Sequence, residues 1–138
     1  MGRILAIDYG RKRTGLAVTD PLCIIAGPLA DIPSNEVFDY IDSYLKNEKV
    51  DVFVVGYPKQ MNNEASEAVI YINPFIKKLA EKYDKIQIDL MDERFTSKMA
   101  FQAMIDGGLK KKKRQDKGLI DKISAVIILQ SWLSMNKK

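Results

Sequence analysis

Three acidic positions stand out because each one adjoins an apolar stretch. Asp8 comes after four consecutive apolar residues, and the pair Asp92-Glu93 ends the stretch IQIDLM. Asp121 precedes a segment, residues 123–129, whose apolar content predicts a buried helix. Two carboxylates about 5 Å apart repel each other by roughly 3 kcal/mol at an effective dielectric constant near 20. Three converging carboxylates would therefore need raised pKa values or a cation, and a divalent cation is the natural solution.

The residue types that the sequence lacks limit the kinds of catalysis that the chain could carry out. The chain has no histidine, and its single cysteine is Cys23, in the apolar context LCIIA that favours a buried structural thiol. Ser-His-Asp catalysis, histidine or cysteine zinc sites and intrachain disulfides are excluded. Oxygen ligands suit Mg²⁺ or Mn²⁺. Two such ions about 4 Å apart could activate a water and stabilise the leaving oxygen of a phosphodiester.

Each acid also has a purely structural explanation. Asp8 could initiate a turn, and Asp92-Glu93 could complement the dipole of a following helix. Asp121 could be a first-turn acid, although it shares a helix face with positions 125, 128 and 132. Separation along the sequence does not show that the three acids meet, so the metal site is a hypothesis at this point.

The opening stretch AIDYGRKRTGLAVTD spaces Gly10 and Gly15 as in the phosphate loop G-x-x-x-x-G-K-[ST]. That loop requires lysine and then serine or threonine after its last glycine, where this chain has Leu16 and Ala17. The alternation of LAVTD indicates a strand, whereas a phosphate loop leads into a helix. We therefore predict a β-hairpin in which Gly10 and Gly15 supply turn conformations.

Apolar runs and helical spacing predict the elements that must position these residues. Strands are expected at 3–8, 14–20, 23–29 (ended near Pro28), 51–58 and 85–93. Helices are expected from Ser34 as N-cap, over 63–83 with a kink or split at Pro74, in TSKMAFQAMIDGG, and over 119–135. This order predicts one α/β domain, residues 1–138. Its mixed five-stranded sheet begins with an antiparallel meander, continues with parallel strands and has helices on both faces. Asp8 and Asp92-Glu93 then share the carboxyl edge of that sheet.

The charge distribution points toward polyanions. The net charge is +4 and the pI about 9.1, with RKR at 11–13 inside the opening motif. A second basic run follows Gly107-Gly108 and comprises Lys110, Lys111, Lys112, Lys113 and Arg114. That run is either a solvated loop or a nucleic-acid clamp. No apolar run reaches the length of a membrane span, and the N-terminus lacks the pattern of a signal peptide, so we expect a cytoplasmic protein.

Four segments in order, AIDYGRKRTGLAVTD, VVGYPKQMN, DERFTS and IDKISAVIILQSWL, resemble the YqgF (RuvX) family over nearly the whole chain. Its members are ribonuclease-H-like nucleases related to Holliday-junction resolvases and proposed to mature the 5′ end of small-subunit ribosomal RNA. The resemblance implies a ribonuclease-H-like fold and a hydrolase that cuts phosphodiester bonds of structured nucleic acid, first of all in pre-16S rRNA. It also implies two Mg²⁺ or Mn²⁺ ions bound with the substrate, and association with the ribosome or the transcription machinery.

The resemblance carries over to particular residues. It implies Asp8, Glu93 and Asp121 as catalytic, metal-binding acids, and it selects Glu93 over Asp92. It also implies phosphate contacts by Lys12, Arg13 and Arg94, and structural turns at Gly10, Gly15 and Gly56.

Other functions fit part of the same pattern. A resolvase of branched DNA would use the same acids. An actin-like or sugar-kinase-type ATP-binding protein shares the D-x-G hairpin that DYG matches, but such proteins need two domains of this kind. A non-catalytic protein that binds RNA or the transcription machinery would bind without metal-dependent cleavage.

Overall fold

The computed structural model describes residues 2–57, 67–92 and 117–136, with side chains described outside 67–69, 92 and 117–123. The strands are β1 (Arg3–Tyr9), β2 (Arg13–Thr19), β3 (Ala26–Pro33), β4 (Val50–Tyr57) and β5 (Gln87–Asp92). The helices are the 3₁₀ helix η1 (Ser34–Glu36), α1 (Val37–Leu45), α2 (Glu67–Lys82) and α5 (Lys117–Met135).

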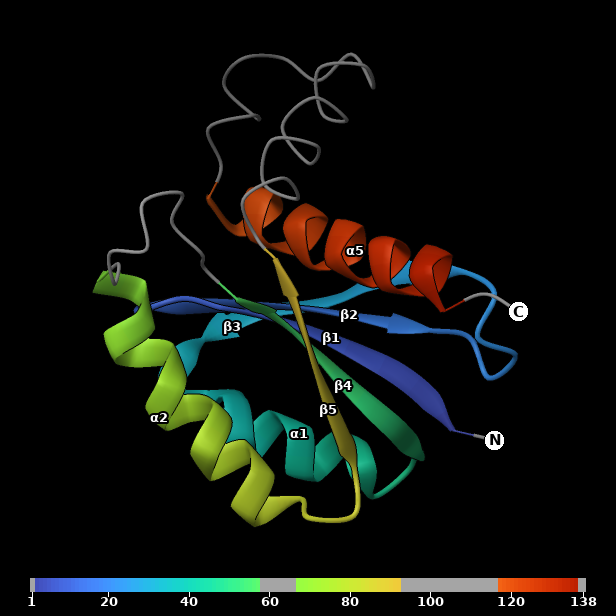
Figure 1. Ribbon diagram of the computed structural model, residues 1–138, viewed down its shortest axis with the longest axis horizontal. Coiled ribbons are helices and arrows are strands. Elements are labelled where there is room, and N and C mark those ends of the chain that lie inside the picture. The colour runs from blue at the N-terminus through green and yellow to red at the C-terminus, as the bar shows by residue number, and fades with distance from the viewer. Residues whose placement is uncertain (1, 58–66, 93–116, 137–138) are drawn as a thin grey trace.

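The five strands form a single mixed sheet in the order β3-β2-β1-β4-β5 (Figure 1). β1 pairs antiparallel with β2, and β2 with β3, whereas the β1–β4 and β4–β5 pairs are parallel. α1 and α2 cover one face of the sheet and α5 covers the other (Figure 1). The predicted α/β architecture, an antiparallel meander followed by parallel strands between helices, is confirmed.

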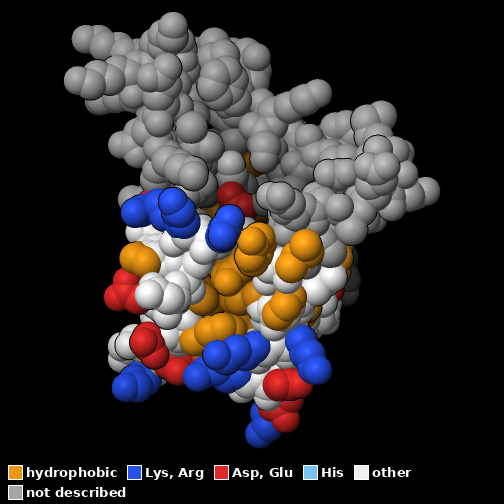
Figure 2. All heavy atoms as spheres, turned by 90° about the vertical axis from the view of Figure 1, so that its left-hand side faces the viewer, with side chains coloured by type: hydrophobic (Ala, Val, Ile, Leu, Met, Phe, Trp, Pro, Cys, Tyr) orange, Lys and Arg blue, Asp and Glu red, His pale blue; other side chains and the backbone are white. Residues whose placement is uncertain are grey.

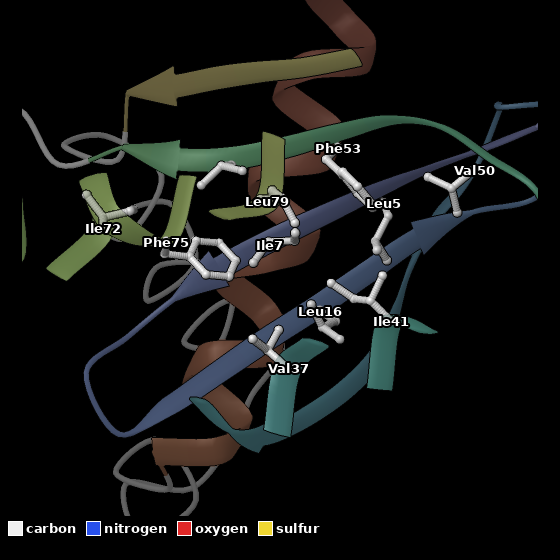
Figure 3. Close-up of a cluster of buried hydrophobic side chains, with 11 residues drawn as sticks. Leu5, Ile7, Leu16, Val37, Ile41, Val50, Phe53, Ile72, Phe75 and Leu79 are labelled. Atoms are coloured by element: carbon white, nitrogen blue, oxygen red, sulfur yellow. The ribbon is translucent and has the colours of Figure 1, made fainter. Parts of the chain in front are cut away.

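The middle of the central strand β1, from Ile4 to Ile7, is apolar because both of its faces are buried. Leu5 and Ile7 point into the larger cluster, which includes Phe53, Phe75 and Leu79 under α1 and α2 (Figure 3). Alternate residues, beginning with Ile4 and Ala6, pack instead against α5 in a second cluster completed by residues such as Val54, Ile128 and Leu129. The alternation assigns every residue of β1 to one of two faces.

The third strand lies further along the chain than predicted. The expected strand at 23–29 is wrong in its bounds, because β3 runs from Ala26 to Pro33 and passes through Pro28. Ile24 and Ile25 are each 68% exposed in the preceding loop, where their backbone N–H groups donate to the carboxylate of Asp20 at 2.8 Å. Cys23 has φ 57° and is half-buried there, so it does not belong to a strand.

Two helix predictions also need correction. Ser34 does not cap α1, since the helix begins at Val37 and the Ser34 hydroxyl bonds to the β1–β2 hairpin. Of the predicted kink or split at Pro74, only the split is wrong, because the helix α2 runs through this residue. Pro74 and Ile70, whose carbonyl the missing N–H would have bonded, are both exposed, so the lost hydrogen bond faces water. Within the described residues, no helix is long and apolar enough to cross a membrane.

Candidate active site

Asp8 lies near the end of β1 on the face of the sheet that α5 covers. Its neighbours of the same parity, Ile4 and Ala6, belong to the cluster under α5, whereas Tyr9 stacks on the other face against Phe75. The carboxylate is only half-buried, although it follows four residues that are at most 5% exposed. Because β1 is hydrogen-bonded to β2 on one side and to β4 on the other, the sheet fixes the position of the Asp8 backbone.

Glycines flank Asp8 on both neighbouring strands. Gly15 is its partner in β2, and Gly56 follows Val55, the partner of Ile7 in β4. The prediction that Gly15 and Gly56 form turns is wrong, because both lie inside strands. Gly15 and Gly56 bring no side chain to the strand positions beside Asp8, and both are buried in the sheet.

Gly10 does serve the hairpin turn, through a close approach. A Cβ at Gly10 would lie 2.5 Å from the carbonyl oxygen of Arg13. The Ser34 hydroxyl donates to the Gly10 carbonyl at 2.5 Å and bonds to the Thr14 hydroxyl at 2.8 Å. The Ser34 backbone N–H donates to the carbonyl of Lys12 at 2.9 Å. The turn that carries the basic residues is thus tied to the chain that follows β3.

Arg13 is held by an acid that sequence reasoning missed. Its Nε and Nη2 groups donate to one carboxylate oxygen of Asp31 at 2.9 and 2.5 Å. The Asp31 side chain is only 4% exposed, and its other oxygen is buried with no hydrogen-bond partner in the part of the chain that the structure describes. Asp31 pairs with Gly15, which pairs with Asp8, so the two acids stand in one row with a glycine between them. Asp31 could have been found only with the bounds of β3, in which it is the one acid, and with the register of β3 against β2.

The ends of β1, β4 and β5 meet at the edge of the sheet where Asp8 lies. Ile7 pairs with Val55, Val55 with Leu90, and β5 ends at Asp92 opposite Tyr57. Figure 1 shows that β4 and β5 end, and α5 begins, near the same edge of the sheet. The predicted site residues Glu93 and Arg94 and the basic run 110–114 lie outside the described residues.

Asp121 belongs to the helix that packs over this face. It lies four residues before Ala125, which with Ile128 and Leu129 is fully buried against the sheet. α5 begins at Lys117, so Asp121 occupies its second turn and not the first. The helix-dipole explanation for this acid is correspondingly weaker, because that effect is confined to the first turn.

The structure thus places the backbones of Asp8 and Asp121 on elements that pack together, and it describes the side chain of Asp8. Lys12 is exposed in the hairpin turn, and Arg13 stands at the start of β2. Within the described residues, no group of three acidic, histidine or cysteine side chains comes together around a potential ion. The half-exposed Asp8 carboxylate nevertheless supplies oxygen donors, which suit a hard divalent cation.

Comparison with known proteins settles the family. The family model described as RuvX, Holliday junction resolvase, matches residues 2–135. The chain belongs to the RuvX family. A relative from Parabacteroides distasonis, named "Putative pre-16S rRNA nuclease", is 58% identical over 99% of this chain and 98% of its own length. A relative from Porphyromonas gingivalis with the same name is 56% identical over 96% of both chains.

Solved structures confirm the ribonuclease-H-like fold of this RuvX chain. The structure titled "T. thermophilus RuvC in complex with Holliday junction substrate" aligns with a TM-score of 0.58 at 16% identity. The alignment covers 99% of this chain and 97% of that one. Family membership confirms the resemblance seen in the sequence and identifies the chain as a hydrolase acting on nucleic acid.

Proposed function

We propose that this RuvX chain is a metal-dependent nuclease that processes the 5′ end of pre-16S rRNA. The observation that carries the proposal is Asp8, a half-buried carboxylate on the α5 face with glycine positions on both sides. Relatives at 56–58% identity that are named for pre-16S rRNA support RNA as the substrate.

Asp8, Glu93 and Asp121 would hold the metal ions. The family resemblance selects Glu93 over Asp92, and Met91, two residues before Glu93 in the sequence, packs in the cluster under α5. Leu90, whose parity Asp92 shares, is half exposed on the other face. When bound, two Mg²⁺ or Mn²⁺ ions would supply an activated water and stabilise the leaving oxygen.

The basic residues would bind the phosphates of the substrate. Arg13 donates two hydrogen bonds to Asp31, which stands in the same cross-strand row as Asp8. Its guanidinium therefore lies on the same face of the sheet as the Asp8 carboxylate. Lys12 is exposed in the adjacent turn, and Arg94 and the run 110–114 are proposed to complete the contact. A role in rRNA maturation would bring the chain to the ribosome precursor in the cytoplasm and close to the transcription machinery.

Asp8→Asn tests this function because it removes a ligand charge with almost no change of volume. We expect it to lower metal-dependent cleavage of a precursor rRNA fragment by at least about a hundredfold, while the fragment still binds. Asp39→Asn is the matched control, since Asp39 is an exposed acid of α1 on the opposite face, and it should cleave like wild type.

The same assay separates the alternatives. Wild type and both variants are incubated with precursor rRNA, single-stranded RNA and four-way-junction DNA, with Mg²⁺, with Mn²⁺ and with chelator. Faster cleavage of the junction than of the RNA would favour the resolvase that the family description names. Tight binding with no metal-dependent cleavage of any substrate would favour the non-catalytic binding protein. Unchanged cleavage by Asp8→Asn would refute the mechanism.

A further inference from the structure

A stripe of aromatic and basic side chains runs along α2, on the face of the sheet opposite to α5. Tyr71, Phe75 and Lys78 are spaced four and three residues apart, so they lie on one side of the helix. Each contacts a ring or a cation from another element. Figure 2 shows hydrophobic side chains gathered between two groups of lysines and arginines on the side of the molecule where α2 lies in Figure 1.

The contacts along the stripe alternate between rings and cations. The Arg11 guanidinium lies 5.1 Å from the ring centre of Tyr71. Phe75 stacks on Tyr9 with ring centres 4.1 Å apart and also meets Phe38 at 5.4 Å. Lys78 places its ammonium 4.9 Å from the ring centre of Phe38.

The two ends of the stripe differ in burial: packing explains the residues toward the end of α2, whereas the end at Tyr71, here called the open end, is exposed. Phe75 is 5% exposed and belongs to the core, which explains its presence. Lys82, further along the helix, is paired with Asp42 at 3.0 Å. A hydrogen bond from Tyr83, reinforced by Lys82, holds the pKa of Asp42 below its usual range. Tyr71, in contrast, is 38% exposed and has an exposed arginine as its neighbour, so the core does not account for it.

The open end lies beside the β1–β2 hairpin turn, which directly follows the strand that carries Asp8. Arg11 lies in the hairpin turn, three residues after Asp8 and two before Arg13. Because Asp8 faces α5 and Tyr71 belongs to α2, a strand leaving Asp8 would pass over this turn, from one face of the sheet to the other, to reach the ring of Tyr71. From Tyr71 to Lys78 the helix rises about 10 Å, the length of roughly three stacked nucleotides.

We propose that Tyr71 and Arg11 bind a single-stranded nucleic-acid segment next to the cleavage site, with Tyr71 stacking on a base and Arg11 and Lys78 contacting phosphates. The inference rests on the proposed nuclease function and adds a substrate class to it. An exposed aromatic face flanked by cations complements bases and phosphates together. A duplex keeps its base faces stacked inside, so this surface selects a substrate with a single-stranded flank.

Fluorescence anisotropy of labelled ten-nucleotide probes, with chelator present so that nothing is cut, tests the site. Tyr71→Ala should raise the Kd for single-stranded RNA about 5- to 100-fold, the range expected for one lost stacking contact. Tyr71→Trp should retain binding. Ile70→Ala, the matched control, removes an adjacent side chain that is 68% exposed and should change the Kd less than twofold. Thermal melting checks that each variant is folded.

Three outcomes would overturn the inference. The first is that Tyr71→Ala binds the single strand like wild type, and the second is that it loses affinity for duplex RNA of the same sequence equally. The third is a loss confined to RNA, because stacking on a base face predicts the same loss for single-stranded DNA. Because the assay measures binding without cleavage, its result is independent of Asp8→Asn. A Tyr71-dependent site with no metal-dependent cleavage would refute only the nuclease, and intact cleavage with no Tyr71 effect would refute only this site.

Discussion

Asp31 and Arg13 form an asymmetric pair beside the proposed catalytic acid. The arginine directs two N–H groups to one oxygen of a nearly buried carboxylate, while its own side chain stays 44% exposed. The second carboxylate oxygen has no hydrogen-bond partner within the described residues, and a buried acceptor of that kind costs about 1–3 kcal/mol. Asp31 thus holds one edge of the Arg13 guanidinium in place although its own second oxygen is left without a partner among the described residues. Such an arrangement is suited to orienting the arginine toward a phosphate.

A double-mutant cycle tests this positioning. Arg13→Ala should weaken binding of the precursor rRNA fragment, and Asp31→Ala should weaken it nearly as much, because the released guanidinium gains conformational freedom. In the double variant the second change should add little, which gives a coupling energy of about 0.5–3 kcal/mol. The measurements are Kd with chelator and the free energy of unfolding of each variant. Additive losses would contradict the idea, as would tighter binding by Asp31→Ala, which would mean that Asp31 competes with the phosphate.

The β1–β2 hairpin presents Arg11, Lys12 and Arg13 in a conformation that Gly10 and Ser34 enforce. Gly10→Ala places a methyl carbon against the Arg13 carbonyl, so the turn must shift; we expect a loss of about 1–3 kcal/mol in the free energy of unfolding. Gly27→Ala is the matched control, since a Cβ there meets nothing within 4 Å, and it should stay within about 0.5 kcal/mol. Urea denaturation compares the two. Equal effects would show that the close approach at Gly10 does not constrain the hairpin.

The sequence predicted best the elements whose own residues form a continuous apolar run. β1 and β4 are buried on both faces, so their unbroken apolar runs located them. β3 was misplaced because the pattern of Ile24 and Ile25 resembles a buried strand, whereas Asp20 holds both in an exposed loop. Asp8 could be found from its own strand. Asp31 and the strand positions of Gly15 and Gly56 depend on register between strands, which a single sequence does not reveal.

At the scale of the molecule, the sheet separates two hydrophobic cores, and each core supports a different proposed functional surface. The cluster under α1 and α2 supports the face with the aromatic stripe, and the cluster under α5 supports the face with Asp8 and the helix that carries Asp121. The Trp132 indole N–H donates to Asp89 at 2.7 Å and fixes α5 to the edge strand β5. The geometry of the proposed metal site therefore depends on how α5 packs, and only indirectly on α2.

Leu79→Ala and Leu129→Ala separate the roles of the two cores, because both side chains are fully buried, one in each core. Each truncation should lower the free energy of unfolding by about 2–5 kcal/mol, in one transition, since the central strands are common to both cores. Only Leu129→Ala lets α5 shift against the sheet, so only this variant should need severalfold more Mg²⁺ for half-maximal cleavage. The comparison is made by titrating Mg²⁺ at a temperature where both variants are folded. If both respond to Mg²⁺ alike, the packing of α5 does not set the metal site, and Asp121 loses its proposed role.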